Sequence, residues 1–402
     1  MEEARQRAQR RRRSYGAGIL ITALVGLGAF FAFRGGDGPD SAQESARDRV
    51  VAALRWRPLP PAPIAGRTGE GVVWTGAEMI VWGGLHEGRH GLGPTAVSNG
   101  AAYNPATRTW RKLAAAPRGM RGVVGSGSVW TGEAALFWTG NSPDGPRGGA
   151  LYYPRTDKWR RLPVGPLGPR EGYSTFWTGQ EALIVSGTRG DAFASPIAAA
   201  INPKTLRWRQ LSPINRLTGL LADGVWSGRE AYLLGARYRC PELGSSCRDR
   251  RRIFLAYNPA TDRVRRISLA KAPTSDLASV AWAHGQMLVS SDDESYTLDR
   301  YDPRTRLWST GASAPCEPAS KGYHQSEWIG DRYVAACGHK SLQLYDPRSD
   351  TWRKIHPGPS PFNSRAGSAI VWTGKELIAW SGSLYKAGNP MAASGASLKL
   401  PD

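Results

Sequence analysis

A hairpin-like segment recurs along this chain of 402 residues, with a period of about fifty residues. Each copy has a hydrophobic run, a short turn with Gly and a second alternating run, which is the pattern of two antiparallel strands. The first copy reads "VVWTGAEMIVWGG". The copies occupy residues 72–84, 128–140, 175–187, 224–236, 280–291, 327–338 and 371–383. Such a repeat constrains the fold more than any single motif does, because every copy must occupy an equivalent structural position.

A second repeated unit lies between the hairpins and usually starts a turn with Asn-Pro or Asp-Pro. Pro presets its own φ angle, and the Asx side chain bonds the backbone ahead of it. The strand after the turn carries a Trp, or Val264 in one copy. The copies occupy residues 101–113, 151–162, 200–211, 256–267, 300–311 and 344–355. We therefore expect four antiparallel strands in each repeat, and four-stranded units repeated radially form a propeller.

The seven hairpins alternate with only six of these second units. The missing outer strand is found before the first hairpin, where "LRWRPLPPAP" at 54–63 matches "TWRKLAAAP" at 109–117. The C-terminal segment 393–402 would supply the third strand of the same unit. A ring closed in this way leaves no exposed sheet edge. We expect an all-β domain, residues 54–402, that is a seven-bladed propeller with its last blade closed by the N-terminal strand.

The Gly-rich hairpin end followed by Y-[ND]-P-x-T-x-x-W resembles the kelch repeat of the galactose-oxidase-like propellers. The resemblance covers residues 54–402, although the paired Gly of the second kelch strand is complete only at Gly83–Gly84. It implies a propeller fold, and a binding role more readily than a chemical reaction.

The resemblance also leaves open a propeller enzyme, either a galactose-oxidase-like oxidase or a lyase acting on a carbohydrate. A copper radical oxidase of this family needs a Tyr cross-linked to a free Cys, with further His and Tyr ligands. The six His are scattered along the chain, and we expect the four Cys to be paired. We therefore expect no catalytic residue, no metal and no cofactor, and an enzyme is the second hypothesis.

The N-terminal region predicts a membrane anchor. Residues 1–14 carry six Arg against two Glu, and residues 15–33 follow without a charge. Nineteen helical residues span about 30 Å, which is the thickness of a bilayer core, and the basic side stays in the cytoplasm. No A-x-A-like cleavage site follows, so we favour an uncleaved signal anchor in the cell membrane. Residues 34–53 form the expected linker, and the propeller is expected to be extracytoplasmic.

The stretch "GGLHEGRHGLG" at 83–93 contains H-E-x-x-H, the zinc signature of metalloproteases. That spacing binds zinc when both His lie on one face of a helix. His86 and His90 instead follow a predicted strand, and the five Gly of this stretch disfavour a helix. The place of a third ligand holds Ala96. We interpret the stretch as a Gly-rich surface loop and expect no metal there.

Four Cys in an exported domain predict two disulfides. Cys240 and Cys247 flank a single predicted loop. Cys316 precedes a first strand and Cys337 ends the second strand of the same hairpin, which brings the two together. Of the three possible pairings we expect 240–247 and 316–337, each stapling a loop.

Four repeats carry a basic residue seven positions before the first-strand Trp: Arg67, Arg170, Lys321 and Arg365. First strands line the central channel of a propeller, so these side chains are expected near its mouth. His324, in a first strand, is a further candidate for ligand binding. The basic residues either form an anion-binding mouth or bond carbonyl groups of a neighbouring blade, and both interpretations remain open.

The net charge of +20 suits an anionic partner, although an Arg excess also follows from a GC-rich genome. All 16 Trp fall at repeated strand positions, which leaves no stacking surface for nucleic acid, so no nucleic-acid partner is expected. Long loops at 84–100, 140–149, 187–198 and 236–252 are predicted on one face, where recognition usually resides. The leading hypothesis is a membrane-anchored, extracytoplasmic module that binds a protein or an anionic cell-envelope polymer.

Overall fold

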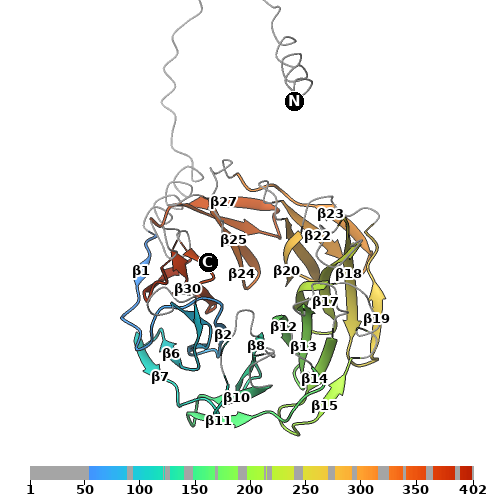
Figure 1. Cartoon of the computed structure of the whole chain (residues 1–402). Helices are drawn as coiled ribbons and strands as arrows, with labels where there is room; N and C mark the ends of the chain where they lie inside the picture. The colour runs from blue at the N-terminus through green and yellow to red at the C-terminus, as the bar shows by residue number, and fades with distance from the viewer. Residues whose placement is uncertain are drawn as a thin grey trace, which may run out of the picture. The chain divides into compact units, whose positions relative to one another are not determined.

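Seven four-stranded antiparallel sheets are arranged radially around a common centre in the described part of the computed structural model (Figure 1). The described residues run from 54 to 400 and belong to one compact unit, residues 47–402. Outside them lie residues 1–53, 88–93, 121, 123–126, 140–147, 168–170, 189–196, 212–213, 215–219, 240–247, 270–276, 292–296, 316–325, 338–340, 359–364, 385–389 and 401–402. The predicted β-propeller with seven four-stranded blades is confirmed.

Each of blades 1 to 6 takes its strands in chain order from the centre outward. Blades 1 to 3 consist of β2 (Gly71–Trp74), β3 (Met79–Trp82), β6 (Gly100–Asn104), β7 (Thr109–Lys112); β8 (Gly127–Trp130), β9 (Ala135–Trp138), β10 (Gly149–Tyr153), β11 (Lys158–Arg161); and β12 (Glu171–Trp177), β13 (Ala182–Thr188), β14 (Ile197–Ile201), β15 (Trp208–Gln210). Blades 4 to 6 consist of β16 (Leu220–Trp226), β17 (Ala231–Arg239), β18 (Arg248–Asn258), β19 (Arg263–Arg266); β20 (Leu277–Ala283), β21 (Gln286–Ser291), β22 (Leu298–Asp302), β23 (Leu307–Thr310); and β24 (Ser326–Ile329), β25 (Arg332–Cys337), β26 (Ser341–Asp346), β27 (Thr351–Ile355).

Blade 7 contains strands from both ends of the described chain. From the centre outward it holds β29 (Ala369–Trp372), β30 (Glu376–Trp380), β32 (Gly395–Lys399) and β1 (Arg57–Pro58). β1 pairs antiparallel with β32, with Arg57 opposite Ser397 and Pro58 opposite Ala396. Two-stranded sheets β4 (Leu85–His86) with β5 (Thr95–Ala96) and β28 (Arg365–Ala366) with β31 (Ser383–Leu384) complete the described strands.

The turn between the first and second strands is built in the same way in five blades. In blade 1 the Thr75 hydroxyl accepts from the Glu78 N–H at 2.9 Å, and Gly76 has a φ of 92°, which favours Gly. The equivalent hydroxyl residues are Thr131, Thr178, Ser227 and Thr373. These short turns and the turns between third and fourth strands project from the same end of the antiparallel sheets. We call that end of the ring the short-turn face.

The core lies between the blades. Buried hydrophobic side chains of the described residues form seven clusters, and each cluster joins two neighbouring blades. The cluster between blades 5 and 6 is the smallest, with only Leu298, Tyr333, Ala335 and Tyr345 as fully buried members. Burial of apolar surface in these seams is what holds rigid sheets in a ring.

Charged side chains connect several seams on the short-turn face. Arg111 donates to the two carboxylate oxygens of Glu78 at 3.1 and 2.7 Å and to the Tyr152 hydroxyl of the next blade at 2.7 Å. Tyr152 in turn donates to Asp157 at 2.6 Å. We call this arrangement the seam clamp. Its counterparts are Arg209 with Glu181, Tyr257 and Asp262, and Arg265 with Glu230 and Tyr301. Part of the Arg excess therefore has a structural use.

No helix among the described residues is long and apolar enough to cross a membrane. The predicted cytoplasmic tail, anchor and linker, residues 1–53, lie outside the described residues. The membrane anchor therefore stays a prediction.

Candidate functional site

The innermost strands are fixed to one another by hydrogen bonds from side chain to backbone. The Ser128 hydroxyl of β8 donates to the Val72 carbonyl of β2 at 3.0 Å. Thr175 of β12 donates to the Ser128 carbonyl at 2.8 Å. A Cβ on Gly127 would lie 2.5 Å from Thr175, so these strands are packed closely. Side chains on them are therefore held by a rigid wall around the ring centre.

Asp223 bridges the inner strands of blades 4 and 5. Its carboxylate accepts the N–H of Gly224 at 2.7 Å and the N–H of Val280, on β20, at 2.8 Å. Burial raises the pKa of Asp223 to about 6, although both backbone N–H groups favour the charged form. The side chain therefore titrates closer to neutrality than an ordinary Asp.

Glu327 on β24 lies near Asp223 although the two belong to blades 6 and 4. Burial, together with the smaller effect of the negative charge of Asp223, raises the pKa of Glu327 to about 7. Blade 5 separates the two blades in the ring, so this electrostatic interaction acts between inner strands of blades that are not neighbours. No described cation forms an ion pair with either carboxylate.

Glu70 is a third carboxylate at the start of an inner strand, immediately before β2. Burial raises its pKa to about 8, while backbone N–H groups and the charge of Arg67 act in the opposite direction. Burial lowers the pKa of Arg67 to about 10, so its guanidinium stays charged at neutral pH. Glu70, Asp223 and Glu327 are called the inner-strand carboxylates below.

Arg67 is 1% exposed, and its guanidinium donates to protein oxygens on all sides. It reaches the Ala65 carbonyl at 3.1 Å, the Gly83 and Asn99 carbonyls at 3.0 Å, and the Asn99 amide oxygen at 2.9 Å. Gly83 and Asn99 lie in the connection between β3 and β6 of blade 1 itself, whereas the carbonyl-bonding interpretation expected acceptors on a neighbouring blade. An anion at Arg67 would have to displace these hydrogen bonds.

Arg365 occupies the equivalent place in blade 7 and is also buried. Its guanidinium donates to the Ser381 carbonyl at 3.1 Å, to the Ser394 carbonyl and to the Ser394 hydroxyl at 2.8 Å. The structure therefore places Arg67 and Arg365 in matching cages of neighbouring blades. It does not bring them together as an open anion site.

The remaining predicted site residues lie largely outside the described residues. They are Arg170, Lys321 and His324, together with Cys240, Cys247 and Cys316, and the side chain of Cys337 is also not described. The anion-binding mouth and both disulfide pairings therefore stay predictions.

Of the two His in the zinc-like motif, only His86 is described. It lies in strand β4 rather than in a helix, and its Nδ1 lies 2.7 Å from the Gly66 carbonyl oxygen. The described residues contain no group of three His, Cys, Asp or Glu side chains that could hold a metal ion.

The inner-strand carboxylates were missed by the sequence reasoning, although the repeat contains a signal for them. Glu327 directly precedes the first-strand Trp, where the other blades have Val, Phe or Ala. Asp223 lies three residues before Trp226, where most other blades have Gly, Ser or Ala. A carboxylate in a position that is otherwise small or apolar departs from the repeat, and such departures mark candidate functional positions.

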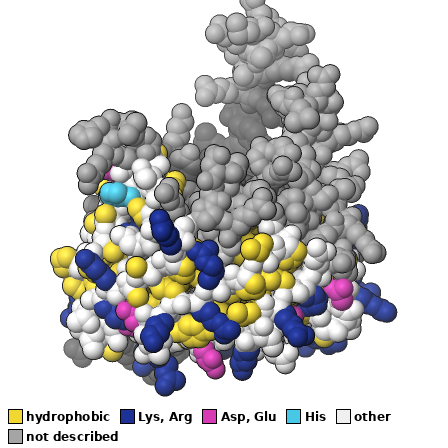
Figure 2. All heavy atoms as spheres, turned by 60° about the horizontal axis from the view of Figure 1, so that its bottom comes forward, with side chains coloured by type: hydrophobic (Ala, Val, Ile, Leu, Met, Phe, Trp, Pro, Cys, Tyr) yellow, Lys and Arg dark blue, Asp and Glu magenta, His cyan; other side chains and the backbone are white. Residues whose placement is uncertain are grey.

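Two carboxyl groups with raised and different pKa values are able to accept a basic side chain or to exchange a proton with a bound molecule. The outer wall of the ring is mostly basic: Figure 2 shows many more Lys and Arg than Asp and Glu side chains on the face it presents. Asp223 and Glu327 therefore form an acidic pair within a cationic protein, and Glu70 stands apart from them beside Arg67 in blade 1.

No protein-family model and no curated protein matches this chain. Among solved structures 883 chains match, so the fold is shared too widely to define one function. One of them is the structure entitled "YCF48 bound to D1 peptide", which is 11% identical, with a TM-score of 0.53 over 86% of this chain and 96% of that chain. At this identity the likeness shows the fold alone. The chain is a seven-bladed β-propeller.

Proposed function

We propose that this protein is a kelch-type, membrane-anchored propeller that binds a segment of a partner protein outside the cytoplasm. The segment binds on the face opposite the short-turn face, called the long-loop face, and a basic side chain of the partner reaches the inner-strand carboxylates.

The observation that carries this proposal is the difference between the two faces. On the short-turn face the described strands are joined by turns of two to six residues, such as 330–331 and 202–207. On the long-loop face the connections range from three residues, 338–340, to seventeen, 83–99. Variable connections on a rigid ring are the usual arrangement for recognition. Glu70 and Arg67 precede β2 and therefore lie toward this face.

Charge favours a protein partner over an anionic polymer at the ring centre. The carboxylates of Asp223 and Glu327 attract a Lys or Arg side chain, whereas the guanidiniums of Arg67 and Arg365 already donate to protein oxygens. The structurally similar YCF48 was solved bound to a D1 peptide, which agrees with this use of the fold. An envelope polymer would depend on Arg170 and Lys321.

Photo-crosslinking on the full-length chain in its native cells tests the proposal. A benzoylphenylalanine is placed at Ser98, exposed on the long-loop side of blade 1, or at Ala77, exposed in the short turn of the same blade. We expect a discrete protein adduct from position 98 only, and its loss in the Asp223→Asn, Glu327→Gln double variant. Equal adducts from both positions, or adducts with polymer only, would contradict the proposal.

The proposed location needs its own measurement. An Arg155→Cys variant places a thiol on an exposed turn of blade 2. We expect an impermeant maleimide to label it in intact cells once any outer barrier is opened. Labelling only after lysis of the cell membrane would overturn the extracytoplasmic assignment.

A second candidate function is an enzyme that acts on a carbohydrate. The observation in its favour is the pair Asp223 and Glu327, whose pKa values of about 6 and about 7 suit proton transfer near neutral pH. Turnover of a polysaccharide by the wild type, lost in both Asp223→Asn and Glu327→Gln, would establish this function in place of simple binding.

A further inference from the structure

The chain that precedes the propeller joins it on the short-turn face. β1 is the outer strand of blade 7 and runs antiparallel to β32, whose end lies beside the short turn 373–375. There the Leu400 N–H donates to the Lys375 carbonyl at 3.3 Å. β1 therefore starts at the short-turn end, and Leu54, just before it, packs against the same hydrophobic cluster as Leu400. The predicted anchor, residues 15–33, is thus attached to the propeller at this face.

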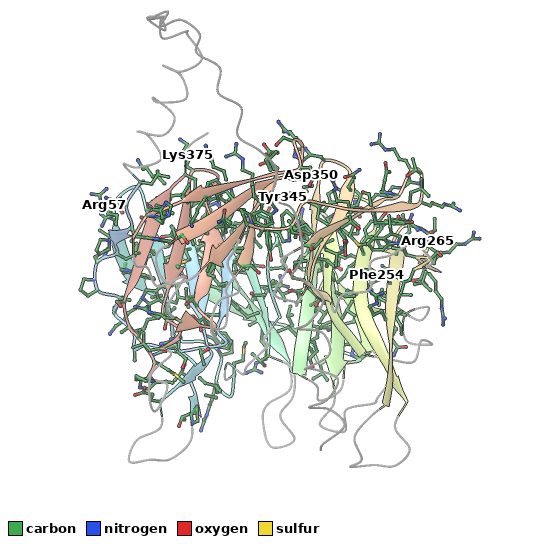
Figure 3. All side chains as sticks on the ribbon, turned by 90° about the horizontal axis from the view of Figure 1, so that it is seen from above. Arg57, Phe254, Arg265, Tyr345, Asp350 and Lys375 are labelled. Atoms are coloured by element: carbon green, nitrogen blue, oxygen red, sulfur yellow. The ribbon has the colours of Figure 1, made fainter. Side chains whose placement is uncertain are left out.

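The short turns give this face a low relief. Turns between described strands have two to six residues here, whereas the connections on the long-loop face reach seventeen. Figure 3 shows Lys375 and Asp350, both from short turns, along one edge of the ring. A rigid ring with such a face can meet a flat surface through several blades at once.

Exposed basic side chains without an ion pair are spread around this face. They extend from the short turns of blades 2, 3, 4, 5 and 7 and from the end of β32. Within the described part of the chain, none of these side chains takes part in a hydrogen bond or an ion pair. We call them the face cations: Arg155, Lys204, Arg229, Arg306, Lys375 and Lys399.

The exposed acids of the described short turns are mostly paired already. Three of them lie between 3.3 and 3.7 Å from an Arg side chain: Asp157, Asp262 and Asp331. Glu133 is the exposed acid of these turns that has no ion pair among the described residues. The unpaired, exposed charge of the short-turn face is therefore positive, and an anionic surface complements it.

We propose that the short-turn face lies against the bilayer and that the face cations bind the headgroups of anionic phospholipids. Chain entry, low relief and positive charge occur together on this face, and a bilayer is the partner that uses all three. This orientation turns the long-loop face away from the membrane, toward a partner protein. The orientation rests on the membrane anchor of the proposed function, whereas the binding of headgroups does not.

Energy transfer from the protein to acceptor-labelled lipid tests the orientation. The full-length protein is reconstituted in vesicles of phosphatidylcholine, alone or mixed with phosphatidylglycerol. It carries one donor dye on an azidophenylalanine at Ala77 or at Ser98, which are exposed on the short-turn and long-loop sides of blade 1. We expect phosphatidylglycerol to raise the transfer from position 77 and not from position 98. The rise should disappear in about 1 M NaCl, where the Debye length is about 3 Å.

A triple variant removes face cations from three neighbouring blades: Arg155→Gln, Lys204→Gln and Arg229→Gln. Each basic residue at an anionic surface favours the bound state by about fivefold, so the joint loss lowers this preference by about a hundredfold. We expect the transfer from position 77 in this variant to be the same with and without phosphatidylglycerol. If the variant fails to fold, the salt dependence of the wild type decides the matter.

A matched control removes the same charge from exposed positions of the outer strands: Lys112→Gln, Arg266→Gln and Lys354→Gln. We expect it to keep the rise that phosphatidylglycerol causes in the wild type. Equal loss in the two triple variants would show attraction by net charge alone and would overturn the proposal. So would an equal rise at positions 77 and 98, or no rise at position 77.

Sodium phosphate is compared with NaCl at equal ionic strength to separate headgroups from free phosphate. We expect the two salts to reduce the transfer equally. A stronger reduction by phosphate would indicate a site for the free anion and would overturn the assignment to a bilayer.

Flotation of the full-length protein on a density gradient separates the proposal from the anchor. Flotation with vesicles of phosphatidylcholine alone supports the anchor, and the energy transfer then decides the orientation. Flotation only with vesicles that contain phosphatidylglycerol would contradict the anchor and support the binding of headgroups. Flotation with neither kind of vesicle would overturn both.

Discussion

Replacing Arg67 separates the two interpretations of the basic residues around the ring centre. If its guanidinium acts as a structural cage residue, Arg67→Ala will destabilise the propeller whether or not a ligand is present. If it forms an anion-binding mouth, the same change will weaken ligand binding and leave the fold intact. Arg67→Lys sharpens the comparison, because Lys keeps the positive charge but lacks the planar fork of donors.

The size of the expected effect follows from the contacts of Arg67. The side chain donates to four oxygen acceptors of Ala65, Gly83 and Asn99, and the residue is 1% exposed. Each buried hydrogen bond contributes about 1 kcal/mol net to stability, and more when the donor is charged. Because water can enter part of the vacated space, we expect Arg67→Ala to lower the free energy of unfolding by about 3–6 kcal/mol. At about 2 °C for each kcal/mol in a large domain, the melting temperature should fall by about 6–12 °C.

The assay is thermal unfolding of Arg67→Ala, Arg67→Lys and the exposed control Arg155→Ala, with long-chain polyphosphate binding measured on the same samples. We expect both Arg67 variants to lose stability and Arg155→Ala to melt like the wild type. A melting temperature within about 2 °C of the wild type in Arg67→Ala, together with a tenfold loss of polyphosphate binding, would refute the cage interpretation.

Three further predictions concern buried and clamped groups. Because the pKa of Glu70 is raised from 4.5 to about 8, the folded state binds an extra proton between these pH values, so its stability should fall as pH rises through this window. Glu70→Gln should remove this dependence of stability on pH, and at pH 8 it should raise the free energy of unfolding by a few kcal/mol, measured by chemical denaturation. An unchanged pH dependence would show that Glu70 is not its source. Gln343 is fully buried, and neither of its amide atoms is hydrogen-bonded among the described residues. Gln343→Leu should therefore raise the melting temperature by about 2–4 °C. A lower melting temperature than that of the wild type would indicate a bound water or ligand at the amide. Glu78→Gln should cost about 1 kcal/mol through the seam clamp in urea unfolding, whereas Glu133→Gln on an exposed turn should cost nothing, and equal effects would argue against the clamp.

The fold was predictable because each repeat carries the same sequence pattern of strands and turns. The strand pairs, the Asx-Pro turns and the number of blades could be read from spacing alone, since a propeller requires little beyond equivalent four-stranded units. The small sheets β4–β5 and β28–β31 were not predicted, because strands of two residues carry no periodic signal.

The candidate site was harder to predict because it depends on departures from the repeat. Asp223 and Glu327 are more than a hundred residues apart in sequence, and only the curvature of the ring brings blades 4 and 6 toward one another across β20. The buried cages of Arg67 and Arg365 likewise depend on the backbone path of the connection between the second and third strands of the same blade. Sequence spacing could not say which atoms the donors of Arg67 and Arg365 would meet.

The pairing of β1 with β32 has a consequence for biosynthesis. Arg57 lies opposite Ser397, so 339 residues separate these two partners of one strand pair in the sequence. At about 5–20 residues per second the N-terminal strand waits about 20–70 s for its partner to leave the ribosome. All residues of the first six blades have been synthesised by then. The time at which the ring can close is therefore determined by the synthesis of the C-terminal strand rather than by the order in which the blades fold.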